Sequence, residues 1–257
     1  MSNSSFFLLT IPLLLAGCAS ETVQPAKSAA VAPQIPATVR AKPRTSNDLL
    51  EQAVAEPPAP FDGEGWKSMF DGKTVVGWRE TQFAGRGEVQ CERGLLILNT
   101  GDPFTGIGYT NEFPVMDYEV AFDAMRMSGS DFFCGLTVPV GTNFCSLIVG
   151  GWGGSLVGIS SLDRMDASEN ETTRYKSFDL RRWYRIRLRI TERRIEAWID
   201  QEKVVNVDTT ERHISLRPGD IELSKPFGIC SWQTSSALRE IKMRLVDGPA
   251  DPLKKRR

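Results

Sequence analysis

The sequence is poor in histidine and carries almost no net charge. Its 257 residues include one histidine, His213, and the 31 basic and 32 acidic residues leave a net charge of -1 at pH 7. A chain with this balance has no long-range field that would gather nucleic acid or an anionic membrane surface. It also lacks a basic stripe interleaved with aromatic residues, so we exclude nucleic acid as a partner. We expect His213, in TTERHISLRPGD, to be a surface loop residue.

Cysteine is scarce, and the CxxC spacing of many zinc sites is missing, which argues against a cysteine zinc site. An exported setting would permit disulfides, and three full pairings of the later cysteines are open. A hairpin turn in PVGTN would place Leu147 opposite Cys134, so Cys145 is out of register for direct pairing. We therefore favour buried free thiols over a disulfide for Cys91, Cys134, Cys145 and Cys230.

The sequence also lacks an apolar run long enough to span a bilayer. The N-terminal run from Phe6 to Leu15 falls short of the ~20 residues that a transmembrane helix needs, but it suits the centre of a signal peptide. It leads into LAGC, which resembles the lipobox of bacterial lipoproteins, where the cysteine is acylated and becomes the new N-terminus. We expect residues 1–17 to be a lipoprotein signal peptide and Cys18 to carry the lipid anchor.

The residues after Cys18 bear on where the anchor lies. Ala19 and Ser20 follow it, with no aspartate to act as an inner-membrane retention signal. We therefore expect an exported lipoprotein in the outer membrane, facing the periplasm or the cell surface. Retention in the inner membrane stays open as an alternative.

Aromatic residues are absent from residues 18–60, which are rich in alanine and proline. Such a segment cannot bury enough apolar surface to offset the entropy of ordering, so we expect a disordered linker. Within it, DLLEQAVA predicts a short helix from Ser46 to Ala55. At the other end of the chain, residues 248–257 are expected to be a frayed basic tail.

Residues 61–247 show a pattern of short strands separated by turns. In YRIRLRI, the apolar Tyr184, Ile186 and Leu188 alternate with arginines, which is typical of a half-buried strand. IEAWID and KVVNVD follow after short turns and complete a β-meander. About ten such strands, without a long amphipathic helix, predict a single all-β domain: an antiparallel β-sandwich of jelly-roll type.

Several segments of this region resemble a known family. GWKSMFDGKTVVGW opens the region, and ERGLLIL, MDYEVAFDAM, RRWYRIRLRITERRIEAWIDQEKVV and LREIKMRL follow in order. Together they resemble the 3-keto-disaccharide hydrolase domain family over Trp66 to Val246. The resemblance implies a concanavalin A-like jelly roll and cleavage of a glycoside whose sugar carries a ketone at carbon 3.

That reaction determines which chemical groups the chain must supply. The ketone acidifies the hydrogen on carbon 2, so cleavage needs a base, a donor or metal for the enolate oxygen, and an acid for the leaving group. Our candidates for catalytic carboxylates are Asp131, at the entry to a central strand, and Glu169 and Glu171, in the loop SSLDRMDASENETTRY. Asp163 and Asp166 of this loop offer oxygen ligands for a divalent cation such as calcium.

Departures from the family pattern leave a second function open. Apolar residues in FCSLIVGG replace the family's middle carboxylate and amide, and Trp232 and Gln233 in CSWQT stand where it carries a histidine. We therefore expect either a lipid-anchored glycan-processing enzyme or a noncatalytic lectin-like module at the cell envelope, with carbohydrate as the partner in both cases. A generic interaction domain that binds no sugar is a third alternative.

Carbohydrate recognition commonly uses aromatic rings, which stack on the apolar faces of sugars, and planar polar groups, which bond hydroxyls. We expect Trp152, Trp232, Asn143 and Gln233 to bind the carbohydrate. Trp198 alternates with acidic residues on an outer face, so a covering role for the sheet is the simpler interpretation.

Trp152 lies in GGWGGS, which leads from one predicted strand directly into another. A phosphate-binding glycine loop needs a helix after it and a Lys-Ser/Thr pair, and neither is present. The glycines would instead clear space on a sheet face or permit a bulge. Two interpretations stay open for Trp152: a sugar platform, or a plug packed against a neighbouring loop.

Overall fold

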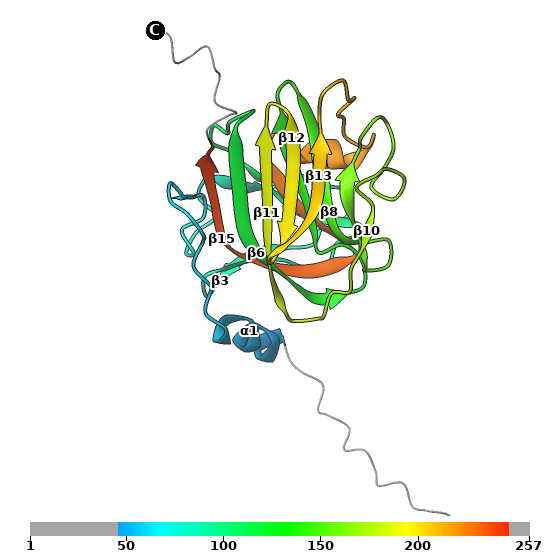
Figure 1. Ribbon diagram of the computed structural model, residues 1–257. Coiled ribbons are helices and arrows are strands. Elements are labelled where there is room, and N and C mark those ends of the chain that lie inside the picture. Colours follow the sequence, from blue (N-terminus) through cyan, green and yellow to red (C-terminus); the bar gives the residue numbers. More distant parts are fainter. Residues whose placement is uncertain (1–45, 247–257) are drawn as a thin grey trace, which may run out of the picture. The chain divides into compact units, whose positions relative to one another are not determined.

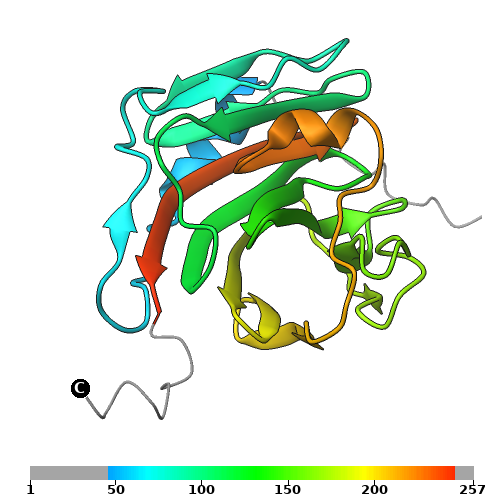
Figure 2. The same cartoon turned by 90° about the horizontal axis from the view of Figure 1, so that it is seen from above.

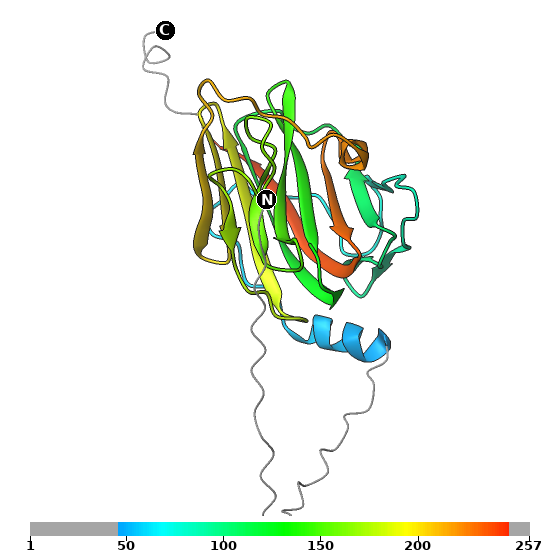
Figure 3. The same cartoon turned by 90° about the vertical axis from the view of Figure 1, so that its right-hand side faces the viewer.

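The computed structural model describes residues 46–246, which form a β-sandwich preceded by a short helix (Figure 1). The predicted signal peptide, Cys18, the first part of the predicted linker and the predicted basic tail lie outside the described residues. The strands form two antiparallel sheets, one of eight strands and one of seven, which Figure 3 shows as two layers. The predicted all-β fold class and antiparallel β-sandwich are confirmed.

The eight-stranded sheet contains the predicted meander. Its strands are β1 (Lys67–Ser68), β3 (Val89–Glu92), β4 (Leu95–Leu98), β6 (Tyr118–Gly129), β11 (Trp183–Thr191), β12 (Arg194–Ile199), β13 (Glu202–Asp208) and β15 (Thr234–Leu245). They are ordered β13-β12-β11-β6-β15-β4-β3, and β1 pairs with β15. Leu188 of β11 lies opposite Ala197 of β12, and both face the core. The period-two pattern therefore sets which face of β11 is buried.

The seven-stranded sheet holds the candidate site. Its strands are β2 (Trp78–Glu80), β5 (Phe104–Tyr109), β7 (Cys134–Val140), β8 (Asn143–Gly151), β9 (Leu156–Ser160), β10 (Arg174–Tyr175) and β14 (Gly228–Trp232). They are ordered β10-β9-β8-β7-β14-β5-β2. The short helix η1 (Asp220–Ser224), orange in Figure 2, lies beside β5 and β14.

The hydrophobic core lies between the two sheets. It includes the inward side chains of β6, such as Val120 and Phe122, and those of β7 and β8, such as Leu136 and Leu147. Each large apolar side chain buried in this way contributes about 1.5–3 kcal/mol relative to an exposed one. Tyr118 of β6 donates its hydroxyl proton to a carbonyl of β7, Pro139 O, at 2.6 Å. Burial raises the pKa of Tyr118 well above its ordinary value, so the hydroxyl stays a donor.

The later cysteines are free thiols, as predicted from their spacing. Cys134, Cys145 and Cys230 are buried, and Cys91 is partly exposed. Burial raises the pKa of Cys145 and of Cys230 to about 12. These two thiols therefore stay protonated at neutral pH and act as small apolar side chains.

The register predicted for the β7–β8 hairpin is wrong by two residues. Cys134 lies opposite Val149, not opposite Leu147. The two-residue turn is Gly141 and Thr142, one residue later than the sequence suggested, and a turn displaced by one residue moves every cross-strand pair by two. Gly141 adopts a φ of 63°, which suits a tight hairpin turn.

The predicted helix is confirmed as α1 (Ser46–Ala55), at the lower edge of the sheets in Figure 1. Leu50 and Ala53 are buried in a cluster with side chains of the eight-stranded sheet, including Trp183. The indole nitrogen of Trp183 donates to the carbonyl of Ala53 at 2.9 Å. This part of the predicted linker is thus packed against the sheet. No helix within residues 46–246 is long and apolar enough to cross a membrane.

Residues 56–66, which we call the strap, continue from α1 across the outer face of the eight-stranded sheet. Its main-chain carbonyls accept hydrogen bonds from Arg185, Arg239 and Arg244. The ring centre of Phe61 lies 3.8 Å from the guanidinium carbon of Arg185, and that of Trp66 lies 4.4 Å from the one of Arg244. The strap therefore covers part of this face with its backbone and two aromatic rings.

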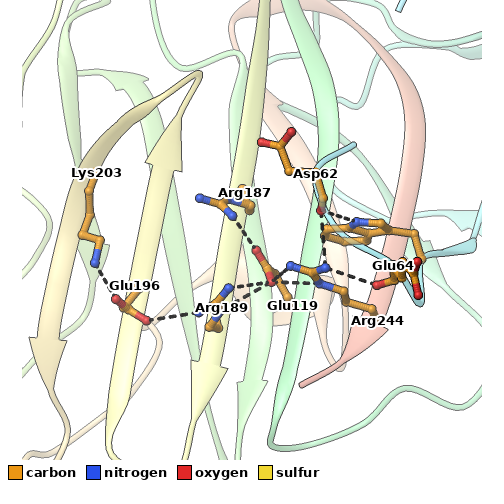
Figure 4. A network of polar contacts seen from close by, with 9 residues as sticks. Asp62, Glu64, Glu119, Arg187, Arg189, Glu196, Lys203 and Arg244 are labelled. Carbon is orange, nitrogen blue, oxygen red and sulfur yellow. Dashed lines mark hydrogen bonds and ion pairs between the residues drawn. The ribbon is translucent and has the colours of Figure 1, made fainter. Parts of the chain in front are cut away.

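Beside the strap, the same face carries a network centred on Glu119 (Figure 4). Glu119 is fully buried; its Oε2 accepts from Arg189 at 3.0 Å and Arg244 at 2.8 Å, and its Oε1 lies 3.2 Å from Arg187. The guanidinium carbon of Arg187 also lies 3.9 Å from the ring centre of Trp198. Trp198 is only 9% exposed, so it covers the sheet, as its position in the sequence suggested.

Candidate functional site

A cleft of about 550 Å³ opens on the outer face of the seven-stranded sheet. Its floor includes the small polar side chains of Ser146 on β8 and Ser160 on β9, together with Ile148. One wall comes from η1 and the residues before it, and another from the turn between β8 and β9. Small outward-facing residues on neighbouring strands thus leave room that larger side chains would fill.

The turn between β8 and β9 carries Trp152, which lines the cleft and is 45% exposed. Trp152 has a φ of 49°, in the left-handed region that bulky residues rarely adopt. Gly150, Gly153 and Gly154 have φ values of 79°, 82° and 111°, where glycine has no steric penalty. Because β8 leads directly into β9, the glycines serve a strained turn that presents an indole at the rim of the cleft.

Asp131 lies at the rim, in the short connection between β6 and β7, and its side chain is linked to this turn. Its Oδ2 accepts a hydrogen bond from the main-chain N–H of Gly153 at 3.2 Å, and its Oδ1 accepts one from Phe132 N at 2.7 Å. The main-chain N–H of Asp131 donates to the hydroxyl of Thr234 at 3.1 Å. These three contacts fix the carboxylate next to the backbone that carries Trp152.

Trp232, at the end of β14, belongs to an aromatic group along the cleft. Its ring packs edge-on against Phe104, with 4.6 Å between centres, and lies 6.2 Å from the ring of Phe132. The main-chain N–H of Trp232 donates to Phe132 O at 3.0 Å. The connection of Asp131 and Phe132 is therefore hydrogen-bonded to both segments that carry the cleft tryptophans.

Asp166 and Arg217 line the cleft from the loops after β9 and β13. Asp166 Oδ2 lies 2.7 Å from Nη1 of Arg217, and its Oδ1 accepts hydrogen bonds from Ser160 Oγ at 2.5 Å and from Ala167 N at 2.7 Å. The side chain of Arg217 is 62% exposed, so its other N–H groups can reach a ligand. Asp220, in the first turn of η1, adds a further carboxylate to this wall.

Two predicted catalytic residues, Glu169 and Glu171, are not among the residues that line the cleft. Glu169 accepts from the main-chain N–H of Asp166 at 3.3 Å, on the outside of the loop. Glu171 makes two hydrogen bonds with Arg212, at 2.6 and 2.9 Å, and these hold its pKa below the ordinary value. A carboxyl with a lowered pKa is a weaker base, which argues against Glu171 in that role.

Two predicted sugar-binding residues also lie outside the lining of the cleft. Asn143 is exposed at the first residue of β8, roughly 27 Å along the strand from the turn that carries Trp152. Gln233 is exposed directly after Trp232, and its main-chain N–H donates to Pro103 O at 2.7 Å. The sequence places both near strand ends but does not determine which end of the sheet each one faces.

The residues suggested for a divalent cation are each engaged with an arginine. Asp163 accepts from the main-chain N–H of His213 at 2.8 Å and from Arg212 at 2.6 Å, and these bonds lower its pKa. Asp166 binds Arg217, as described above. Within residues 46–246, no group of three His, Cys, Asp or Glu side chains is placed to hold a metal ion. A cation at Asp163 or Asp166 would have to displace a guanidinium. His213 is exposed, as predicted.

Arg217 and Asp220 are cleft residues that sequence reasoning missed. Both belong to RPGD, a stretch with turn composition that leads into η1. Its pair of opposite charges around Pro-Gly was a signal for an ordered turn. Only the folded chain shows that this turn lies against the outer face of the seven-stranded sheet.

The sequence profile of the 3-keto-alpha-glucoside-1,2-lyase-like domain family matches residues 65–244. The chain belongs to this family. The match spans the whole sandwich from β1 to nearly the end of β15, so it includes every strand that borders the cleft. It confirms the resemblance drawn from the sequence motifs. Family membership indicates a glycan-processing or carbohydrate-binding domain.

Several solved structures are similar to this chain. One is a carbohydrate-binding module, CBM66, from Bacillus subtilis, with 14% identity, a TM-score of 0.45 and coverage of 65% of this chain and 95% of that chain. Another is a Bacillus subtilis protein of unknown function with a galectin-like fold, with 13% identity, a TM-score of 0.49 and coverage of 68% and 92%. A third is the exoplasmic/lumenal domain of VIP36 bound to Ca²⁺ and Man3GlcNAc, with 10% identity, a TM-score of 0.48 and coverage of 75% and 95%.

The two antiparallel sheets form the sandwich that the resemblance implies. No curated protein sequence matches the chain.

Proposed function

We propose that the chain binds a 3-keto-glucoside in the cleft of the seven-stranded sheet and cleaves it by elimination. The observation that carries this proposal is that the short connection between β6 and β7 is hydrogen-bonded to both segments that carry the cleft tryptophans. Asp131 accepts from the turn of Trp152, and Phe132 accepts from Trp232. A carboxylate is thereby held beside two aromatic rings, in a cleft large enough for a sugar.

The proposed elimination uses groups that this cleft contains. Asp131 takes the proton from carbon 2, the electrons of that bond form the double bond between carbons 1 and 2, and the bond from carbon 1 to the glycosidic oxygen breaks. Arg217 donates N–H groups to the ketone oxygen as negative charge develops there. The departing oxygen receives its proton from water or from the protonated Asp131. The indole of Trp152 stacks on the apolar face of the ring.

The test is incubation of the purified chain with 3-keto-trehalose, with detection of released glucose by mass spectrometry. Wild type is expected to release glucose, and Asp131→Asn is expected to bind the probe but lower the rate at least 100-fold, since a positioned base contributes about 10²–10⁴-fold. Glu171→Gln serves as the matched control, with an unchanged rate. Release by Asp131→Asn at the wild-type rate would exclude Asp131 as the base.

A noncatalytic, lectin-like function is the second candidate. It is favoured by the hydrogen bonds that already engage two of the three cleft carboxylates, Asp131 with main-chain N–H groups and Asp166 with Arg217 and Ser160. Saturable binding of 3-keto-trehalose in calorimetry without any release of glucose would support this function. Absence of binding and of cleavage would refute both candidates.

We also propose that Cys18 carries a lipid anchor that holds the exported chain at the outer membrane. Support comes from the LAGC motif after the short apolar run and from the absence of aspartate after the cysteine. Radiolabelled palmitate should be incorporated into the wild-type chain in bacteria and not into Cys18→Ser. Fractionation should then find the wild type with the outer membrane; recovery with the inner membrane would contradict the proposed location.

A further inference from the structure

Arg126 occupies a position that an apolar residue would ordinarily fill. Along β6, Tyr118, Val120, Phe122 and Ala124 face the core, and Arg126 is the next residue in this inward series. It is only 5% exposed. A buried guanidinium loses hydration, and such a charge is retained at a cost unless its N–H groups find acceptors. Its contacts therefore indicate what the residue does.

The acceptors of Arg126 lie on the turn that carries Trp152. Nη2 of Arg126 donates to Gly154 O at 2.8 Å and to Gly150 O at 3.3 Å, and the guanidinium carbon lies 5.2 Å from the ring centre of Phe133. Burial lowers the pKa of Arg126, and the charge of Asp131 offsets part of this change. Arg126, a residue of the eight-stranded sheet, thus hydrogen-bonds two carbonyls in a turn of the seven-stranded sheet.

The glycines of this turn provide the space that Arg126 needs. A Cβ on Gly150 would lie 2.5 Å from Nη2 of Arg126, and one on Gly154 would lie 3.1 Å from Nη1. Asp131 meets the same turn from the other side, through the N–H of Gly153. Opposite charges therefore hold the turn at its carbonyls and at an N–H, while Trp152 stays in its left-handed conformation at the rim.

We propose that Arg126 is a positioning residue that holds Trp152 in its ligand-facing pose. This inference rests on the proposed function, because Trp152 is taken as the ring that stacks on the sugar. Arg126 does not line the cleft, so it acts through the turn and not on the ligand. The guanidinium beneath the turn then accounts for Gly150 and Gly154, one glycine of each pair that flanks Trp152.

The first experiment needs no ligand and measures amide hydrogen exchange at residues 151–155 in Arg126→Met and Arg126→Lys. Two N–H groups of the turn, those of Gly154 and Ser155, bond Gly151 O at 3.1 and 3.2 Å and report on its order. We expect their exchange in Arg126→Met to rise about tenfold, while amides of β11 stay protected. Arg126→Lys, which keeps the charge, should restore part of the protection.

Arg185→Met is the matched control, because Arg185 lies on the opposite outer face and contacts the strap. In Arg185→Met, the amides of residues 151–155 should exchange at the wild-type rate. Unchanged exchange of the turn in Arg126→Met would overturn the inference. If Arg126→Met does not fold, the same comparison is made with Arg126→Gln and Arg126→Lys, and turn protection equal to wild type in the folded variant would overturn it as well.

The second experiment is a double-mutant cycle on the affinity for 3-keto-trehalose. Trp152→Ala and Arg126→Met are each expected to weaken binding about tenfold, and the double variant to be no weaker than about tenfold, because both remove one interaction. Losses that multiply to about a hundredfold would assign Arg126 a role independent of Trp152 and overturn the inference. If wild type does not bind the probe, the proposed function fails, while the exchange experiment still decides whether Arg126 orders the turn.

Discussion

The two sheets of the sandwich have contrasting outer faces. On the eight-stranded sheet, the charged groups bind one another around Glu119, and the strap covers neighbouring strands with carbonyls and aromatic rings. On the seven-stranded sheet, a cleft of about 550 Å³ stays unfilled, and Trp152 stands at its rim with nearly half its surface exposed.

This difference arises from side chains, because both faces belong to the same two-layer fold. Where polar groups and aromatic rings contact one another, as on the eight-stranded sheet, they stabilise the fold and few of them remain available to a ligand. Where small residues leave a cleft beside aromatic rings and carboxylates, a face can bind a ligand. We therefore expect substitutions on the first face to change the free energy of unfolding and those on the second to change ligand affinity.

The largest expected effect is on the eight-stranded sheet, for Glu119→Gln. Loss of this buried charge leaves Arg187, Arg189 and Arg244 crowded together without their shared carboxylate. Breaking a buried pair costs about 3–5 kcal/mol, and partial exposure of the arginines places this variant near about 3 kcal/mol. Urea denaturation measures the change in the free energy of unfolding.

The matched control is Glu196→Gln on the same face. Glu196 pairs with Lys203 at 2.7 Å and is partly exposed, so the expected loss is below about 1 kcal/mol. Affinity for 3-keto-trehalose should be unchanged in both variants, since neither residue lines the cleft. A Glu119→Gln variant as stable as Glu196→Gln would show that the network does not stabilise this face.

A second pair of variants makes the same change on each face. Trp198→Ala removes a ring held between Arg187 and Lys203, and should lower the free energy of unfolding by about 2–3 kcal/mol without a change in affinity. Trp152→Ala removes an exposed ring, and should weaken binding of 3-keto-trehalose about tenfold, about 1.4 kcal/mol, with little change in stability. Calorimetry and urea denaturation of both variants provide the comparison.

A large stability loss in Trp152→Ala with unchanged binding would mean that Trp152 is a plug for its turn. The contrast between the two faces would then not hold at Trp152.

Much of the eight-stranded sheet could be predicted from the sequence. The alternation in YRIRLRI assigns Ile186 and Leu188 to the core because side chains in a strand alternate between faces. The helix at Ser46–Ala55 was also readable from local pattern. The inward position of Arg126 was available in YEVAFDAMRM by the same counting, as a charge in a core register.

The cleft was only partly predictable because loops assemble it. Asp131, Trp152 and Trp232 were identified at strand ends, where chemistry-bearing residues are common, and all three line the cleft. The cleft wall that contains Arg217 and Asp220 comes from a loop distant in sequence from Asp131 and Trp152. Local sequence pattern does not predict where such a loop packs. The position of the Glu171 side chain was unpredictable for the same reason, because it depends on a pairing with Arg212, which is distant in sequence.

A third, smaller effect concerns the charge of the ligand. The cleft holds the carboxylates of Asp131, Asp166 and Asp220 against one guanidinium, that of Arg217, which leaves two negative charges in excess (three minus one). Methyl glucuronide should therefore displace 3-keto-trehalose about fivefold less effectively than methyl glucoside at low salt, about 1 kcal/mol. Added salt should narrow the difference by screening.

Substitution of a cleft carboxylate sharpens this test. Asp220→Asn should reduce the discrimination against the glucuronide, while Asp208→Asn, at the exposed end of β13, should leave it unchanged. Equal competition by the two glycosides at low salt would contradict a role for cleft charge in ligand choice.

The smallest effect is the pH dependence of the loop between β9 and β10, beside the cleft. Arg212 holds the pKa of Glu171 below its ordinary value of 4.5, so the folded state favours the charged form. The resulting stability is present above the ordinary pKa and is lost as the pH falls through the lower pKa of the folded state. Because Glu171 is half exposed, screening limits the contribution to about 0.3–0.5 kcal/mol. Glu171→Gln should therefore be slightly less stable than wild type at about pH 6, and the difference should shrink as the pH falls below the ordinary pKa of 4.5. Unfolding curves of wild type, Glu171→Gln and the control Glu169→Gln, which has no arginine partner within residues 46–246, provide the measurement. A difference for Glu171→Gln that persists unchanged at low pH would mean that its packing, and not its charge, supports the loop.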